Sequence, residues 1–241
     1  KHVFVEKPLA VNHEHLAKFM KAVPHWENDS RDGGDRANLG GDPLGVNCRP
    51  PQVMVGFNRR FAPTTRWLKE RMAGVPDPLS VHCTVNAGPI PSDHWVRDPV
   101  EGGGRVISEL CHFVDLIQYL SGSVPVRVQS EYLSAEGYAP GDNLAVTLRM
   151  ANGAMGSVNY MSVGDKRFPR ERIEVFGGES VGIIENFRSA KHVRNGRTKR
   201  MRHRLGSDRG HEMELRRFFE AIQTGGPAPV AITEYVYTTL A

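Results

Sequence analysis

A strand, a helix and a second strand follow one another within the first 60 residues. The opening HVFVEKP is a short apolar run that ends at charged residues and a proline, as a buried strand does where it enters a loop. Asn12 stands at an N-cap position, and Leu16, Phe19, Met20 and Val23 follow at helical spacing. QVMVGF then supplies a second apolar strand. This order is the repeat unit of a parallel sheet, which predicts an α/β segment.

Residues 24–52 are rich in Gly, Pro, Asp, Asn and Arg and have no hydrophobic period, so we expect a long loop insertion there. One β-α-β unit does not make a doubly wound sheet. The chain also lacks an initiator methionine and any G-x-G-x-x-G turn, although Gly102 to Gly104 superficially resemble one. Residues 1–62 are therefore predicted to be the last β-α-β of a larger domain whose N-terminal part is missing.

From residue 63 onward, helices and strands no longer alternate regularly. Helices are expected over 65–72, 105–120 and 208–223, and from about 233, where the chain stops within the pattern. Strands are expected over 79–87, 124–135, 144–150, 155–163, 172–176 and 181–186. Several alternate apolar and polar residues, and turns such as Asn152-Gly153 separate them, which favours antiparallel pairing. Residues 63–241 are thus predicted to be an α+β domain with a large, mostly antiparallel sheet, truncated at its C-terminus.

The composition is that of a globular protein: 241 residues, 39% hydrophobic and 24% charged. It has no apolar run long enough to cross a membrane and no signal peptide, so we expect a cytoplasmic protein without a membrane partner. Cys48, Cys83 and Cys111 lack metal-type spacing and are expected to be reduced thiols.

The net charge of +4 is concentrated between residues 188 and 204. This segment contains Arg188, Lys191, Arg194, Arg197, Lys199, Arg200, Arg202 and Arg204 and no acidic residue. A nucleic-acid surface would need interleaved aromatic residues, and Phe187 is the only one nearby. A basic strand pair turning at VRNGRT on the sheet edge is the preferred interpretation, and we expect no nucleic-acid partner.

Two groups of residues could carry chemistry. Glu6-Lys7-Pro8 ends the first strand, at the edge where open parallel sheets bind ligands, and a lysine there can donate to a substrate oxygen. An exposed, functionless lysine is the alternative. In GGGRVISELCHFVDLIQYL, the residues Glu109, His112 and Asp115 recur every three positions and can share one helix face. This spacing is equally consistent with a buried structural histidine and with a catalytic one. No metal site is expected, because ligands three residues apart would be spread along the helix axis and could not surround one ion.

The segments KHVFVEKPLA, VMVGFNRRFAP, VNAGPIPSDHW, GGGRVISELCHFVDLIQYLSG and ERIEVFGG, in this order, resemble the Gfo/Idh/MocA family of nicotinamide-dependent sugar and cyclitol oxidoreductases. The similarity covers nearly the whole chain except residues 24–52, and it is greatest to the branch called bi-domain oxidoreductases. It implies that residues 1–62 are the remnant of an NAD(P)-binding Rossmann domain, and that residues 63–241 are the substrate and oligomerisation domain.

The resemblance also implies roles for individual residues. Lys7 and His112 fall on the family's catalytic positions, and Glu6, Lys7 and Pro8 fall beside the cofactor. Ser108 stands where many members have an aspartate, so Glu109 is a candidate to replace that residue. By motif position, the candidate substrate contacts are Asn58, Arg60, Asn86, His94, Trp95, Asp115 and Arg172.

The implied parent enzyme transfers a hydride between NAD or NADP and a hydroxyl-bearing carbon of a sugar, nucleotide sugar or cyclitol. The alternative is a non-enzymatic oligomerisation or ligand-binding module. Without the phosphate-binding turn, we expect this chain alone to bind no cofactor tightly and to be inactive. We further expect a homo-oligomer formed through the sheet domain, with Lys7 and His112 facing one cleft.

Overall fold

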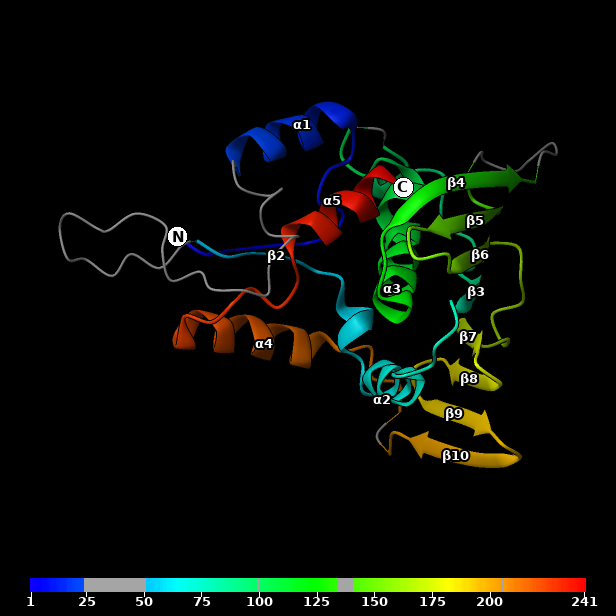
Figure 1. Cartoon of the computed structure of the whole chain (residues 1–241). Helices are drawn as coiled ribbons and strands as arrows, with labels where there is room; N and C mark the ends of the chain where they lie inside the picture. The colour runs from blue at the N-terminus through cyan, green and yellow to red at the C-terminus, as the bar shows by residue number, and fades with distance from the viewer. Residues whose placement is uncertain (24–50, 99, 134–140, 205) are drawn as a thin grey trace.

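The computed structural model describes residues 1–23, 51–98, 100–133, 141–204 and 206–241. They form a small two-stranded sheet and a large eight-stranded sheet, with helices between them (Figure 1). The predicted loop falls almost wholly outside the described residues, as do Cys48 and the end of the strand expected over 124–135.

The N-terminal segment is a β-α-β unit, as predicted. Strand β1 (Val3–Val5) pairs in parallel with β2 (Val53–Val55), and helix α1 (His13–Ala22) lies between them in sequence. Asn12 caps α1 because its side-chain oxygen accepts a hydrogen bond from the His15 amide at 2.8 Å.

The large sheet has the strand order β10-β9-β8-β7-β3-β6-β5-β4. All neighbouring pairs are antiparallel except β3 and β6, so the prediction of a mostly antiparallel sheet is confirmed. The strands are β3 (Ser80–Asn86), β4 (Pro125–Tyr132), β5 (Leu144–Met150), β6 (Met155–Met161), β7 (Glu171–Gly177), β8 (Ser180–Glu185), β9 (Ser189–Arg194) and β10 (Arg197–Arg202).

Two helices, α2 (Pro63–Met72) and α3 (Cys111–Ser121), cover one face of this sheet (Figure 1). The core between these helices and the sheet is apolar and includes Leu68, Ile117, Val158 and Ile173, all fully buried. The opposite face carries no helix among the described residues and exposes several large apolar side chains. These include Met155 and Phe176, whereas the exposed Val128 and Tyr132 of the edge strand β4 pair with the core residues Leu148 and Leu144 and lie on the helix-covered side.

The basic segment forms the edge of the sheet, as predicted. Strands β9 and β10 pair antiparallel, and β10 is the last strand in the order. Asn195 and Gly196 make the turn with φ of 51° and 68°, the left-handed conformation that tight hairpins require. Positive charge on an edge strand discourages pairing with other strands.

The structure differs from the sequence prediction at the helix expected over 105–120. Its first part, Val106–Leu110, is a π-helical turn, and regular α-helix begins only at Cys111. The turn follows Gly103 and Gly104, which have φ of 67° and 85°. One of its carbonyl groups bonds a side chain from the N-terminal unit. The spacing of apolar residues in the segment does not reflect this tertiary contact, so the π-helical turn could not be predicted from it.

The C-terminal helices α4 (His211–Thr224) and α5 (Ile232–Leu240) return to the N-terminal unit. Phe218 of α4 and Tyr235 of α5 share a second hydrophobic core with Met54 and Val55 of β2. The chain thus packs its last elements against its first, and the short η3 turn (Asn58–Phe61) lies between the two cores.

Candidate functional site

Lys7 reaches the helix that carries His112. Its side-chain ammonium donates a hydrogen bond to the backbone carbonyl of Ser108, in the π-helical turn one helical turn before His112. The hydroxyl of Ser108 points elsewhere and donates to the Gly104 carbonyl at 2.7 Å. Lys7 therefore has a fixed partner, and an ammonium group has two further protons to offer a ligand.

His112 lies in the first turn of α3 with only 7% of its surface exposed. Its ring stands edge-on to Phe57, with centroids 5.9 Å apart, and its Nδ1 atom has no hydrogen-bond partner among the described residues. Burial, reinforced by the positive charges of Arg59 and Lys7 and by His211, holds the pKa of His112 well below its usual value. The imidazole is therefore neutral at physiological pH and able to accept a proton.

Glu109 faces the sheet and makes no hydrogen bond to His112. Its carboxylate accepts a hydrogen bond from the buried Tyr160 hydroxyl at 2.5 Å and pairs with Arg105 at 3.3 Å. Arg170 approaches the same carboxylate at 3.7 Å. The structure thus connects Glu109 to β6 and to the start of β7.

Arg60 and Asp115 form a buried ion pair. The guanidinium donates to both Asp115 oxygens, at 2.5 and 3.0 Å, and a third bond of 2.8 Å reaches Glu234 of α5. Asp115 is completely buried, and Arg60 is 4% exposed. These contacts tie η3, α3 and α5 together and occupy the polar atoms that a substrate would need. Asn58 is likewise engaged, since its amide donates to the Arg209 carbonyl at 2.9 Å.

Sequence reasoning did not single out Arg59, although it precedes Arg60 in η3. Arg59 bonds buried Glu171 at 2.7 Å, and Arg209 bonds the other Glu171 oxygen at 3.1 Å. Burial alone would raise the pKa of Glu171, but these two cations lower it. After burial, the positive charge of Arg59 is the next cause of the low pKa of His112.

Glu214 of α4 was also missed. It is 3% exposed, and its Oε1 atom has no partner among the described residues. Burial, with the negative charges of Glu6 and Asp115, raises its pKa to about 8. Glu6 itself is exposed, and a Cβ at Gly56 would lie 3.1 Å from one of its oxygens. Glu214 is thus a buried, neutral carboxylic acid close to Glu6, at the end of β1 that also carries Lys7 and the half-buried Pro8.

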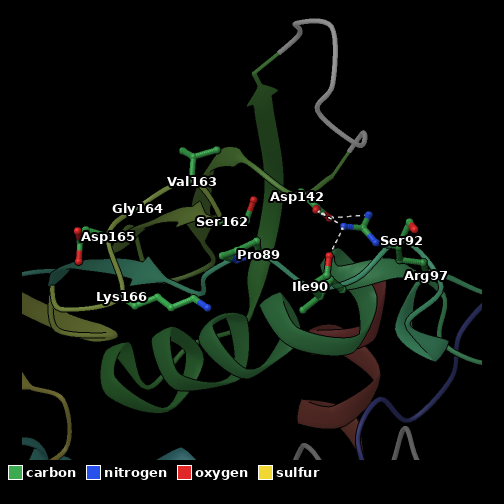
Figure 2. A pocket seen from close by; sticks show the side chains of 10 residues that line it. All are labelled: Pro89, Ile90, Ser92, Arg97, Asp142, Ser162, Val163, Gly164, Asp165 and Lys166. Atoms are coloured by element: carbon green, nitrogen blue, oxygen red, sulfur yellow. Dashed lines mark hydrogen bonds and ion pairs between the residues drawn. The ribbon is translucent and has the colours of Figure 1, made fainter.

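A cavity of about 950 Å³ opens at the end of the sheet where β3 and β6 finish (Figure 2). One wall carries Arg97 and Asp142, which form an ion pair at 2.6 Å, and the other is the segment after β6 with Val163 and Lys166. The lining is Pro89, Ile90, Ser92, Arg97, Asp142, Ser162, Val163, Gly164, Asp165 and Lys166.

Two predicted substrate residues, Asn86 and His94, hold segments of these walls, and a third, Trp95, lies against His94. The Asn86 amide holds the second wall by donating to the Asp165 carbonyl at 2.7 Å. The His94 ring caps the short turn that carries Arg97 by accepting from the Val96 amide at 3.2 Å. Trp95 stacks on His94 and is 58% exposed.

Arg172 is placed apart from the other candidates. It alternates with the buried Glu171 and Ile173 along β7, so its side chain emerges on the face of the sheet that the helices leave uncovered. There it pairs with Glu174 at 2.9 Å and Glu185 at 2.6 Å.

No three His, Cys, Asp or Glu side chains come together as a possible metal site in the described ranges. Cys83 and Cys111 are buried free thiols, and burial raises the pKa of Cys111 to about 12, so it is not a nucleophile at neutral pH. Within the same ranges, no helix is long and apolar enough to cross a membrane.

The described fold is a mostly antiparallel sheet with helices on one face, joined to a parallel β-α-β unit, and Lys7 contacts the turn before His112 where the two meet. This architecture matches the C-terminal domain of Gfo/Idh/MocA oxidoreductases. Residues 66–181 match the sequence model of the GFO/IDH/MocA C-terminal domain. The chain therefore contains a Gfo/Idh/MocA C-terminal domain.

Solved structures share this fold. Levoglucosan dehydrogenase in complex with NADH and levoglucosan superposes with a TM-score of 0.72 at 20% identity, covering 100% of this chain and 69% of its own. UDP-N-acetylglucosamine 3-dehydrogenase from Acidithiobacillus ferrooxidans gives 0.70 at 16% identity, with coverages of 99% and 67%. A protein described as a probable dehydrogenase from Thermotoga maritima gives 0.67 at 24% identity, with coverages of 100% and 68%. No curated protein matches the sequence. At these identities the likeness shows the fold.

Proposed function

We propose that this chain supplies the substrate side of a nicotinamide-dependent oxidoreductase acting on a hydroxyl of a sugar, nucleotide sugar or cyclitol. The observation that supports the proposal is the contact of Lys7 with the helical turn that precedes His112. Lys7 and His112 are far apart in sequence, yet Lys7 bonds the Ser108 carbonyl and contributes to the low pKa of His112. A cation and a neutral base at one place are what alcohol oxidation requires.

In the proposed reaction, His112 accepts the proton of the substrate hydroxyl while Lys7 donates a hydrogen bond to the same oxygen. The C–H bond of the carbinol breaks with its electron pair leaving as hydride, and the carbon–oxygen double bond forms. A nicotinamide ring, when bound, supplies the hydride acceptor. Burial, followed by the positive charges of Arg59 and Lys7, lowers the pKa of His112 and keeps the imidazole unprotonated at physiological pH, and Arg59 is itself held by Glu171.

The residues present fit one end of such a cofactor. Glu6, Lys7 and Pro8 stand at the carboxyl end of a parallel strand, where α/β sheets bind dinucleotides. The sequence contains no G-x-G-x-x-G turn to hold a pyrophosphate. We therefore propose that this chain alone binds NAD(H) too weakly to measure by calorimetry, and saturable binding at micromolar cofactor would contradict this assignment.

A chain with a dinucleotide-binding segment of a homologue fused ahead of Lys1 tests the proposed activity. We expect it to reduce NAD or NADP with at least one member of a sugar and cyclitol panel. Lys7→Ala and His112→Ala should each lower kcat by about 10²–10⁴, the usual contribution of a positioned acid-base group. Arg172→Ala, on the uncovered face of the sheet, is the matched control.

The second candidate function is a non-enzymatic oligomerisation or ligand-binding module. The uncovered face of the sheet favours it, because the large apolar side chains of Met155 and Phe176 are exposed there. We propose that a second copy of this chain covers this face, whether or not the chain is catalytic. Light scattering should give a mass above that of one chain, and Phe176→Lys should lower it. A fused chain that binds cofactor and sugars without transferring hydride would favour the module.

A further inference from the structure

We propose that the cavity between Arg97 and Val163 binds a second sugar ring, so that the substrate is a disaccharide or another glycoside. This inference rests on the proposed function, in which the first ring lies at Lys7 and His112. It specifies the substrate class of that site, and three features of the cavity support it.

The first feature is the chemistry of the lining. Arg97 and Lys166 are balanced by Asp142 and Asp165, so the walls have no net charge and favour neither a phosphate nor an ammonium group. Lys166 has no polar partner among the described residues, and the carboxylate of Asp142 has lone pairs beyond those that Arg97 uses. Apolar Pro89, Ile90 and Val163 separate these groups. Charged donors and acceptors that balance one another, with the hydroxyls of Ser92 and Ser162, over apolar walls match a pyranose ring, which has hydroxyls at its rim and C–H groups on its faces.

The second feature is the rigidity of the first wall. Arg97 donates to both Asp142 oxygens, at 2.6 and 3.3 Å, and to the Pro91 carbonyl at 3.1 Å. A Cβ at Gly102 would lie 2.4 Å from the Val96 carbonyl oxygen, so glycine is required where the chain passes behind this wall. A preformed wall loses little entropy when a ligand binds.

Asn86 builds the opposite wall in the same way. Its amide donates to the Asp165 carbonyl, and a Cβ at Gly164 would lie 2.2 Å from its Oδ1 atom. In Figure 2 the Lys166 side chain extends from this wall toward the other. Both walls are therefore in place before a ligand arrives.

The third feature is position. Arg105 donates to the Gly88 carbonyl at 2.8 Å, directly before Pro89 in the lining, and a Cβ at Gly141 would lie 3.2 Å from Val106. The cavity therefore adjoins the start of the helix that carries His112. Arg105 and His112 are seven residues apart, about 10 Å at the α-helical rise and less across the π-helical turn, so a second ring beside Arg105 would extend a first ring bound at His112.

The chain as it exists tests this inference, because binding requires no cofactor. Calorimetry and saturation-transfer NMR should be run with lactose, maltose, cellobiose and trehalose, and with glucose and galactose alone. We expect at least one disaccharide to bind at least tenfold more tightly than either monosaccharide. Val163→Trp, which fills the cavity from an exposed position, should abolish that preference, and Asp142→Asn should reduce it. Val126→Trp, an equal change at an exposed position of β4 outside the cavity lining, should leave it intact.

The proposal is overturned if no disaccharide binds more tightly than the monosaccharides, or if Val163→Trp preserves the preference. Tighter binding of UDP-glucose than of every disaccharide would also overturn it, because a neutral lining gives a diphosphate no advantage. Unchanged thermal unfolding of both tryptophan variants shows that folding is not the cause. Disaccharide binding in a fused chain that transfers no hydride would refute the proposed reaction and leave the cavity assignment standing.

Discussion

The ammonium group of Lys7 donates its hydrogen bond to the backbone carbonyl of Ser108, not to a side chain. This bond joins the end of β1 to a π-helical turn 101 residues later in the chain. π-Turns insert one residue into a helix and redirect carbonyl groups, and they are frequent at functional sites. The partner of Lys7 is therefore a backbone carbonyl group and not a side-chain carboxylate.

Ser108→Ala should therefore have little effect on the proposed hydride transfer. The substitution removes the hydroxyl bond to Gly104, a contribution of about 0.5–1.5 kcal/mol, and leaves the carbonyl that holds Lys7. We expect kcat in the fused chain to fall by no more than about tenfold. A loss as large as that of Lys7→Ala would show that the hydroxyl itself takes part.

His112 should make the protein less stable in acid. Its pKa in the folded state lies well below the usual 6.5, so between these two values the unfolded chain binds a proton that the folded chain does not. Its contribution to stability is complete above pH 6.5 and is lost as the pH falls below it, by at most about 1.4 kcal/mol per pH unit. His112→Gln should remove this slope from denaturant unfolding measured between pH 5 and 7.

Glu214 should make the protein less stable as the pH rises. Its pKa is raised to about 8, so the folded chain keeps a proton that the unfolded chain has released above its usual value of 4.5. Its contribution to stability is complete below pH 4.5 and is lost as the pH rises through about 8. Glu214→Gln should therefore stabilise the protein most at pH 8 and hardly at pH 4.5. Equal effects at both pH values would show that the side chain is not protonated.

We expect substitutions of Arg60 or Asp115 to lower the stability of the folded protein. Breaking a buried pair leaves an uncompensated charge, so Arg60→Met or Asp115→Asn alone should cost about 3–5 kcal/mol of the free energy of unfolding. The double change Arg60→Met with Asp115→Leu should recover much of this loss. If both single variants unfold normally and raise KM in the fused chain, these residues contact substrate instead.

Local sequence patterns predicted much of the fold. The alternation of β3 and β5 to β8, the Asn12 cap and the Asn152-Gly153 turn each depend on residues close together in the chain, and the structure contains all of them. The packing of α4 and α5 on β2 depends on contacts between the two ends of the chain, which no local period encodes.

The candidate site likewise combines residues that local motifs reveal with residues that only tertiary contacts bring in. Glu6, Lys7 and His112 stand in motifs that can be read in the sequence. The partners Arg59, Tyr160 and Asp142 come from separate segments and have no local signal. Glu109 illustrates the limit, because the sequence places it near His112 on one helix, and only the tertiary structure shows that Tyr160 and Arg105 engage it.

The central claim is that Lys7 and His112 act together on one hydroxyl. The most direct test is a double-mutant cycle of hydride transfer in the fused chain, with Lys7→Met, His112→Gln and both changes. If the two residues serve one proton transfer, each single change should cost nearly as much kcat as the pair. Effects that multiply, or a double variant that retains the full rate, would contradict the account.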